Sequence, residues 1–295
     1  MSVLRTAISA AKAAGIDTRR IYTGLSARSL EAAIREQGLA PLRDRLREIV
    51  PDIGDQYSYD LEATELEAFW EPKMRGLHAF QIDCLRQAID GTNGEDPSPI
   101  SVADIGDSSG NHLRYLRALL PADRLGRAIS VNLDPVAVDK IRARGGEALL
   151  ARAEEMSLEG EPFDVAVSFE MMEHLTDPAR FLYNLARSGA AKRFVMTVPF
   201  VRNSRVGLQF LRSGAPLPAR VTAEQVHIFE LSPDDWKLLC RFAGWRVDFQ
   251  RIYYQYPRKS PLRLTAGLWK RLDFEGFLCL ALVPDTGIAD RYADW

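Results

Sequence analysis

The stretch that most constrains the fold of this chain runs from Ile100 to Gly110 and reads Ile-Ser-Val-Ala-Asp-Ile-Gly-Asp-Ser-Ser-Gly. An apolar run that closes on an acid predicts a buried strand, and the glycine- and serine-rich segment after it predicts a tight turn. From His112 to Leu120 the apolar residues then recur at helical spacing. Such a strand–turn–helix unit is typical of nucleotide cradles, although the same pattern also occurs as a tight turn without a ligand.

A second apolar run, from Ala128 to Leu133, ends at Asp134, and another helical pattern begins at Pro135. In an open α/β sheet the end of this second strand lies beside the first turn. A carboxylate accepts two hydrogen bonds from vicinal hydroxyls, so Asp134 is a candidate to hold a ribose. The helix dipole also favours an acid at a helix N-terminus, and this interpretation explains Asp134 equally well.

Two further apolar runs, Phe163–Phe169 and Arg193–Pro199, flank the segment Glu170-Met-Met-Glu-His-Leu175 and a helical pattern from Ala179 to Arg187. Together with Asp104-x-Gly-x-Ser-x-Gly110 and Asp134, in this order, the segment resembles the class I S-adenosylmethionine-dependent methyltransferases. The resemblance covers about residues 98 to 283. It is to the group whose fourth strand ends in a Glu-His-Leu or Glu-His-Val turn, which includes quinone, natural-product and sugar or lipopolysaccharide enzymes.

This resemblance implies an α/β fold with a doubly wound, Rossmann-like sheet of seven mostly parallel strands, the last of them antiparallel. After the run Arg193–Pro199 we expect a short helix at Gly207–Arg212 and a helix that Ser232 caps and that runs to Phe242. The sixth and seventh strands are expected at Trp245–Tyr254 and Gly276–Val283.

The resemblance also implies S-adenosylmethionine as the cofactor. The residues that it implies for cofactor binding are Asp104, Gly106, Asp107, Ser108, Gly110, Asn132, Asp134, Ala153, Glu154, Ser168, Phe169 and Glu170. Two positions depart from the family pattern. Ser108 replaces the middle glycine and fits if its φ is negative, with a hydroxyl that can bond the cofactor. Arg152 stands where an acid often accepts the adenine amino group, which leaves that role to Glu154 or to the backbone.

The chain has 295 residues, more than one core of this fold requires. Helical patterns over residues 1–92 predict an N-terminal extension, at Val3–Ala14, Ser29–Gln37, Leu42–Ile49 and Lys73–Ile89. The turn-rich segment Gly91–Pro99 separates this extension from a methyltransferase domain at residues 98–295.

Charge and cysteine usage narrow the function class. A formal net charge of −2 gives no reason to expect a nucleic-acid partner. The three cysteines are far apart and no Cys/His spacing suggests a metal site, so we expect no disulfide, no metal and a cytoplasmic protein. No apolar run approaches the roughly 20 residues of a membrane helix, so membrane contact would be peripheral at most.

Two histidines are candidates for the chemistry. Methyl transfer to oxygen requires alignment of the acceptor and removal of a hydroxyl proton, and histidine suits the second task. His227 is the preferred general base, because it follows a long connection that would border the acceptor pocket; His174 is the second candidate. Each can equally be structural. A hydrolase with Glu170 and Glu173 as paired carboxylates on one side of a helix turn is a weaker alternative.

The acceptor is expected to be a hydroxyl of a sugar, a glycan or another small molecule, methylated without a metal. Two aromatic and basic stretches, Tyr253–Arg263 with Trp269–Arg271 and Trp70–Arg75, are candidates for a surface that binds a phosphorylated or lipid-linked acceptor. A homo-oligomer is compatible with these features. A non-catalytic scaffold and a nicotinamide-dependent oxidoreductase remain the alternatives from other classes.

Overall fold

The structure is a computed structural model that describes residues 17–56, 67–93, 98–158, 160–214, 216, 219, 226–271 and 275–292. The helix predicted at Val3–Ala14 lies outside these residues.

One seven-stranded sheet organises the molecule, with the strand order β3-β2-β1-β4-β5-β9-β8. Its strands are β1 (Ile100–Ile105), β2 (Leu125–Asn132), β3 (Glu147–Leu150), β4 (Val165–Phe169), β5 (Phe194–Pro199), β8 (Trp245–Tyr254) and β9 (Gly276–Pro284). The first five strands pair in parallel, and β9 is antiparallel to both β5 and β8. The predicted doubly wound α/β fold with an antiparallel last strand is therefore confirmed.

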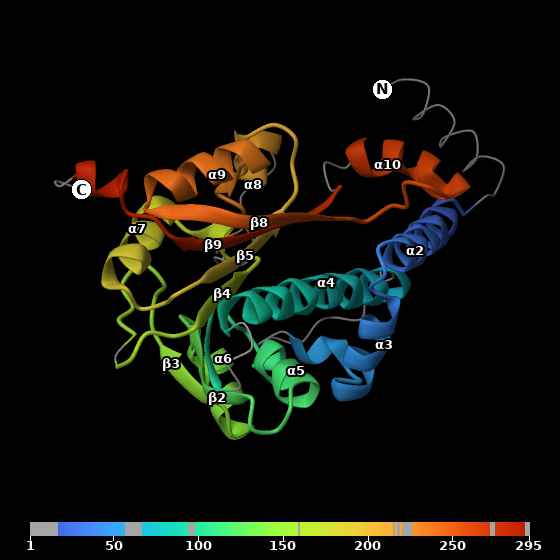
Figure 1. The fold of residues 1–295 in the computed structure, drawn as a ribbon. Coiled ribbons are helices and arrows are strands. Elements are labelled where there is room, and N and C mark those ends of the chain that lie inside the picture. The colour runs from blue at the N-terminus through green and yellow to red at the C-terminus, as the bar shows by residue number, and fades with distance from the viewer. Residues whose placement is uncertain are drawn as a thin grey trace.

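Helices cover both faces of this sheet (Figure 1). One face packs on α4 (Glu67–Asn93) and α5 (Asn111–Leu119), and the other on α7 (Pro178–Ser188) and α9 (Pro233–Phe242). Successive strand residues point to opposite faces, so Val102 and Ala103 enter different cores. Helix α6 (Pro135–Ala143) packs on β3.

The N-terminal helices α2 (Thr18–Glu36) and α3 (Ala40–Ile49) gather with α10 (Ala266–Arg271) around the end of α4 that lies away from β4 (Figure 1). The boundary expected between residues 92 and 98 falls after α4, which continues through Asn93 into the predicted linker. Leu77 and Phe80 of α4 share one core with strands β1, β4, β5, β8 and β9, so α4 is part of the helical layer that covers one face of the sheet.

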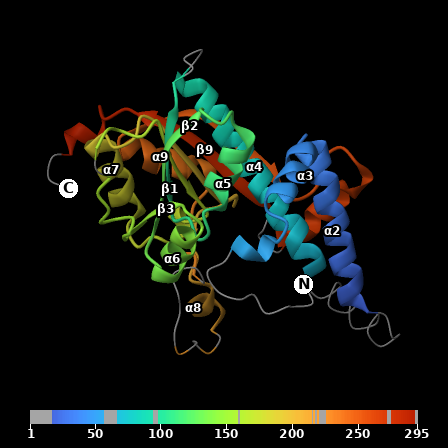
Figure 2. The same cartoon turned by 90° about the horizontal axis from the view of Figure 1, so that it is seen from below.

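A smaller two-stranded sheet, β6 (Arg205–Val206) with β7 (Phe229–Glu230), follows β5. The predicted short helix is α8 (Gln209–Ser213), which stands away from the main sheet in Figure 2. Short 3-10 turns are η1 (Ile53–Gln56), η2 (Met172–His174), η4 (Pro261–Thr265) and η5 (Ala289–Arg291).

The helix predicted to follow Ser232 is α9, and the Ser232 hydroxyl oxygen accepts from the backbone N–H of Asp235 at 3.3 Å. None of the helices in the described part of the chain combines the length and the apolar character that a membrane span requires.

The strand order reverses between β1 and β4, because the chain leaves β1 toward β2 and β3 and returns to the other side of β1 as β4. Open α/β sheets bind their ligands at the carboxyl ends of the strands at such a point. The turn after β1 and the segment after β4 meet there.

Candidate functional site

The turn after β1 is built around Gly106 and Asp107. Gly106 has a φ of 94°, and a Cβ at this position would lie 2.7 Å from Met171 Cγ. Asp107 accepts hydrogen bonds from the backbone N–H groups of Ser109 and Gly110 at 3.0 and 2.8 Å, and from the Ser130 hydroxyl at 2.7 Å. The buried Asp107 carboxylate thus holds the turn in shape and links it to β2.

The end of β2 completes this turn. Asn132 donates its side-chain N–H to the Asp107 carbonyl at 2.9 Å, and its side-chain oxygen accepts from the Asp134 N–H at 2.8 Å. Asp134 is the N-cap of α6 and accepts from the Val136 N–H at 2.9 Å. Asp134 had two interpretations, a ribose ligand and a residue that caps a helix N-terminus. Its observed contacts are those of the N-terminal cap.

A buried polar pair lies beneath the turn. His112 Nδ1 and Asp104 Oδ2 are 2.9 Å apart, and the His112 ring meets Phe169 edge-on with centroids 4.9 Å apart. Burial, and then the neighbouring Asp107 charge, raise the pKa of Asp104 to about 6. Burial lowers the pKa of His112, but the Asp104 carboxylate outweighs this and raises it overall.

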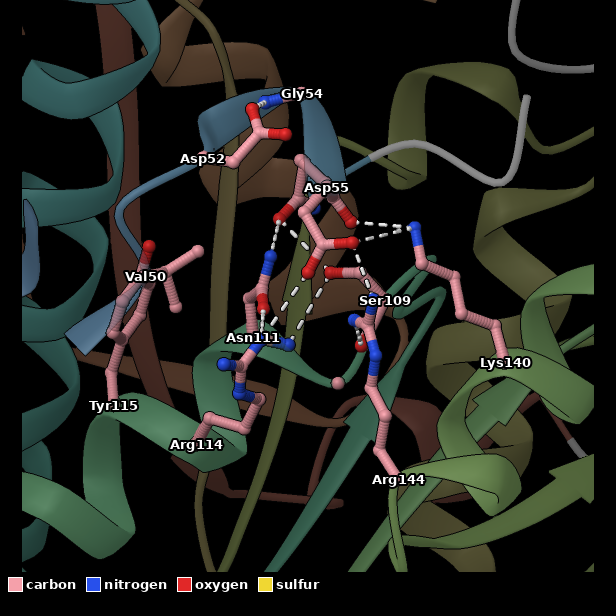
Figure 3. A network of polar contacts seen from close by, with 12 residues as sticks. Val50, Asp52, Gly54, Asp55, Ser109, Asn111, Arg114, Tyr115, Lys140 and Arg144 are labelled. Atoms are coloured by element: carbon pink, nitrogen blue, oxygen red, sulfur yellow. Dashed lines mark hydrogen bonds and ion pairs between the residues drawn. The ribbon is translucent and has the colours of Figure 1, made fainter. Parts of the chain in front are cut away.

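The η1 segment lies directly on the turn (Figure 3). The Ser108 hydroxyl donates to the Gln56 carbonyl at 2.7 Å, and Gln56 Nε2 donates to Ser108 Oγ at 3.2 Å. The Gln56 side-chain oxygen accepts from Ser109 Oγ at 3.1 Å and from Asn111 Nδ2 at 3.3 Å. Ser108 keeps a negative φ, as a serine at this position requires. Its hydroxyl therefore binds the N-terminal part of this chain.

Asp55 anchors the same segment to α5 and α6 (Figure 3). Its carboxylate forms ion pairs with Arg114 at 3.3 Å, with Lys140 at 3.4 Å and with Arg144. Burial raises the pKa of Asp55, but these cations, Arg144 foremost, lower it overall. Sequence reasoning missed both Asp55 and Gln56, because residues 52–56 carry no periodic pattern that connects them to a turn some 50 residues later.

The segment after β3 holds Arg152, Ala153 and Glu154 in a turn. The Arg152 side chain is half exposed and lies 3.8 Å from Glu154, whose carboxylate also accepts from the Thr176 hydroxyl at 3.4 Å. The mostly buried Glu154 is thus the acid nearest the position where the family pattern expects one.

The segment after β4 departs from the expected helical turn. Glu170 has a φ of 54°, and the 3-10 turn η2 follows it, so Glu170 and Glu173 do not share one side of an α-helix. A positive φ is usually adopted by glycine. Because residue 170 is a glutamate, the sequence predicts a regular helical turn here and not this backbone conformation. Ser168 Oγ and Glu170 Oε1 are buried and have no hydrogen-bond partner among the described residues.

Two histidines from distant segments meet beside these acids. The rings of His174 and His227 are edge to face, with centroids 4.8 Å apart. His174 Nδ1 lies 2.9 Å from the Val226 carbonyl, and His227 Nδ1 lies 3.1 Å from Glu230 Oε1. The His227 contact and the Arg205 ion pair lower the pKa of Glu230 to about 2.

Burial disfavours the ionised form of two carboxylates near these histidines, Glu170 and Glu173. Burial, and then the Glu230 charge, raise the pKa of Glu173 to about 8. Burial and the Glu173 charge raise the pKa of Glu170 well above its usual value, although Thr197, His227 and Lys73 oppose this. Burial lowers the pKa of Lys73 to about 8, against the attraction of Glu170.

The small β6–β7 sheet positions His227. The Leu208 N–H donates to the His227 carbonyl at 2.7 Å, and the Ile228 N–H donates to the Glu173 carbonyl at 2.7 Å. A Cβ on Gly207 would lie 2.2 Å from the His227 carbonyl oxygen, so the backbones can approach this closely only because residue 207 is glycine.

Part of the two aromatic and basic stretches is buried in the protein. Tyr253 and Trp269 are buried in the core, and the Tyr256 hydroxyl donates to Glu275 at 2.6 Å. Arg75 is also buried and donates to the carbonyls of Val50 and Pro51 at 2.6 and 2.5 Å. These buried residues are not available as acceptor surface, whereas Arg258, Lys259 and Arg263 are exposed, and for them the acceptor surface stays a prediction.

The residues after β1 and β4 fit the cofactor that the resemblance implies. Ser168 Oγ and Glu170 Oε1 are buried, and neither atom has a hydrogen-bond partner among the described residues. His112 Nε2 is likewise buried without a hydrogen-bond partner among the described residues. Buried polar atoms without hydrogen-bond partners near the carboxyl ends of the strands are the groups that a polar ligand would bind.

Residues 103–190 match a family described as a methyltransferase domain. This range begins in β1, ends just after α7 and contains both the turn after β1 and the Glu-His-Leu segment. A search of curated proteins finds no match to the chain.

Solved structures share the fold. One is a chain of the complex between the Haloferax volcanii Trm112 methyltransferase activator and a proposed methyltransferase, at a TM-score of 0.50 and 18% identity over 73% of this chain and 94% of that one. Another is a proposed sarcosine dimethylglycine methyltransferase from Galdieria sulphuraria, at a TM-score of 0.51 and 12% identity over 72% of this chain and 87% of that one. At these identities the likeness supports the fold alone.

Proposed function

We propose that this chain is an S-adenosylmethionine-dependent methyltransferase that methylates a hydroxyl oxygen of a sugar, a glycan or another small molecule; the match of residues 103–190 to a methyltransferase domain supports the first part. The observation that carries the proposal is His227, which Glu230 orients at the carboxyl edge of the sheet next to His174. A hydroxyl loses a proton when it is methylated, and a histidine held by a carboxylate is suited to assist that loss.

The sequence of the β4 segment favours oxygen over a planar amino nitrogen as the acceptor. Enzymes that methylate nucleobase or glutamine nitrogens by way of an Asn-Pro-Pro-Tyr motif hold the amino group with the asparagine and a proline carbonyl. The corresponding residues here are Ser168-Phe169-Glu170-Met171, which offer no such pair.

We further propose which residues hold the cofactor. Gly106 and the β4 segment Ser168–Glu170 would bind its methionine end, Asn132 and Asp134 its ribose, and Ala153 with Glu154 its adenine. Asp104, Asp107, Ser108 and Gly110 would act by keeping the turn in shape, because their side chains or backbones bond within the protein. S-adenosylmethionine supplies an electrophilic methyl group when it is bound.

His227→Ala tests the role of the histidine. We expect kcat to fall roughly 100-fold or more, because a positioned base contributes about that factor. Calorimetry should show unchanged S-adenosylmethionine affinity, and Glu147→Gln on an exposed end of β3 should leave both quantities unaltered. Wild-type turnover in His227→Ala would contradict the assignment.

The acceptor class is tested by the product. Protein supplied with S-adenosylmethionine that carries a ¹³C-labelled methyl group is incubated with fractionated small molecules and glycans. The carbon chemical shift of a methyl ether differs clearly from that of an N-methyl or S-methyl group. We expect the methyl ether; label found only on nitrogen or sulfur would exclude a hydroxyl acceptor.

A further inference from the structure

We propose that Glu173, His174 and His227 form a binding site for a divalent transition-metal ion, with Glu170 beside it as a further oxygen donor. One donor atom from each of the first three residues lies within 4.8 Å of the other two. His174 Nε2 and Glu173 Oε1 are 3.8 Å apart. The site joins the segment after β4 to the segment before β7, and it follows from the tertiary structure alone.

The hydrogen bonds of the two histidines prepare them as ligands. His174 Nδ1 is bonded to a backbone carbonyl and His227 Nδ1 to the Glu230 carboxylate, and both of these partners accept hydrogen bonds. Each Nδ1 therefore carries a proton, so Nε2 is the ring nitrogen through which either histidine would bind a metal. Histidine ligands of metals are oriented in this manner, by a carbonyl or a carboxylate on the other ring nitrogen.

The carboxylates supply the second argument. Glu173 is only 1% exposed, and neither of its oxygens has a hydrogen-bond partner among the described residues. Glu170 Oε1 is also buried without one, but Thr197 and Lys73 already stabilise the Glu170 carboxylate, so the need for a positive charge concerns Glu173. Buried carboxylates without hydrogen bonds are costly unless a positive charge compensates them. A divalent ion would provide that charge.

The spacing requires only a small adjustment. Donor atoms about 2.1 Å from one ion lie about 3.0 to 3.4 Å from one another. The 3.8 Å separation of His174 Nε2 and Glu173 Oε1 is close to this range, and since all donor atoms lie within 4.8 Å of one another, no separation in the cluster exceeds the range by more than about 2 Å.

A second cluster, Asp104, Asp107 and His112, has similar composition but does not qualify. The Asp107 oxygens accept from Ser109, Gly110 and Ser130, and Asp104 bonds to His112. Its donor atoms already stabilise the turn after β1. The contrast between the two clusters identifies Glu173, His174 and His227 as the ligands.

The donor set selects the kind of ion. Two imidazole nitrogens with one or two carboxylates suit Zn²⁺, Fe²⁺, Mn²⁺ or Co²⁺ better than Mg²⁺ or Ca²⁺, which prefer oxygen ligands. A metal at this site would depart from the metal-independent transfer that the sequence analysis expects. No short sequence motif indicates the proposed metal site, because His227 lies 53 positions after His174 in the sequence.

The role of the ion rests on the proposed function. A bound divalent ion lowers the pKa of a coordinated hydroxyl, so the acceptor would bind the ion through the oxygen that is methylated and release its proton to solvent. That oxygen then forms the bond to the methyl carbon as the bond from carbon to sulfur breaks, which leaves a neutral thioether. In this arrangement His227 would hold the ion through Nε2, and the ion would take over the assistance to proton loss that the proposed function gives to His227.

Metal binding is tested first, without any acceptor. The purified full-length protein is dialysed against a chelator and then titrated with Zn²⁺, Co²⁺, Mn²⁺ and Mg²⁺, with bound metal measured by mass spectrometry and Co²⁺ also by visible absorption. We expect one transition-metal ion per chain and at least 10-fold weaker binding in both Glu173→Gln and His227→Asn. Glu147→Gln should bind as wild type does.

Three results would overturn the site: no bound ion, unchanged binding in both ligand variants, or loss of binding in His112→Asn but not in His227→Asn. Circular dichroism and S-adenosylmethionine calorimetry establish that each variant is folded, and Glu173→Asp, which keeps the charge, replaces any variant that is not. An ion bound by a protein that methylates no hydroxyl would refute the proposed function and leave the metal site standing.

Discussion

Asp134 and Ser108 illustrate how single residues here serve structure where a ligand contact is the first expectation. Asp134 caps α6, and the Ser108 hydroxyl bonds to the backbone of Gln56. Both side chains are short and polar, and such side chains readily bond to nearby backbone groups. A cap does not exclude a ribose contact, because a carboxylate has a second oxygen.

Two substitutions at Asp134 separate the roles. Asp134→Ala should lower the free energy of unfolding by about 1 kcal/mol, because the N-cap is lost, whereas Asp134→Ser keeps a capping oxygen and should cost little. If the carboxylate also holds the ribose, both variants weaken S-adenosylmethionine binding by about 1 to 3 kcal/mol. Chemical denaturation and calorimetry measure the two effects, and unchanged affinity in both variants would restrict Asp134 to the cap.

At the scale of elements, an ion pair connects the segment after β5 to the ends of β8 and β9. Arg202 donates to both oxygens of Glu275, at 2.6 and 3.0 Å, and the Tyr256 hydroxyl donates to the same carboxylate at 2.6 Å. Arg202 precedes β6, so these bonds tie the base of the β6–β7 sheet to β8 and β9. Burial raises the pKa of Glu275, but the Arg202 and Tyr256 hydrogen bonds lower it overall.

This ion pair predicts a pH dependence. The folded-state pKa of Glu275 lies below the ordinary value of 4.5, so its contribution to stability is complete above that pH and is lost as the pH falls through the folded-state value. Glu275→Gln should lower the free energy of unfolding by about 1 to 3 kcal/mol at pH 7. The difference from wild type should shrink below pH 4.5, when followed by denaturation across pH. A difference that is constant with pH would mean that the charge is unimportant.

At the scale of the whole molecule, the N-terminal helices and the sheet form one structure. Helix α4 fills the core on one face of the sheet, and η1 bonds to the turn after β1 and to α5 and α6. From these contacts we expect the two parts to unfold as one cooperative unit.

Truncation tests this coupling. A chain that begins at residue 98 would expose the apolar face that α4 covers, so we expect no cooperative melting transition by calorimetry or circular dichroism. A chain that begins at residue 67 keeps α4 and should retain a transition, at a lower temperature. If the chain from residue 98 melts like the full-length protein, the extension is a separate domain.

The sequence by itself determined strands β1, β2, β4, β5, β8 and β9, the turn after β1 and the cap at Ser232, because these features depend on periodicity and on backbone bonds between residues a few positions apart. The match of Trp245–Tyr254 to β8 illustrates this. Only the tertiary structure decided that Gln56 lies on the turn, that Tyr253 is buried and that His227 meets Glu173 and His174. Such contacts join residues about 50 or more positions apart, and they depend on how whole elements pack, which no local pattern specifies.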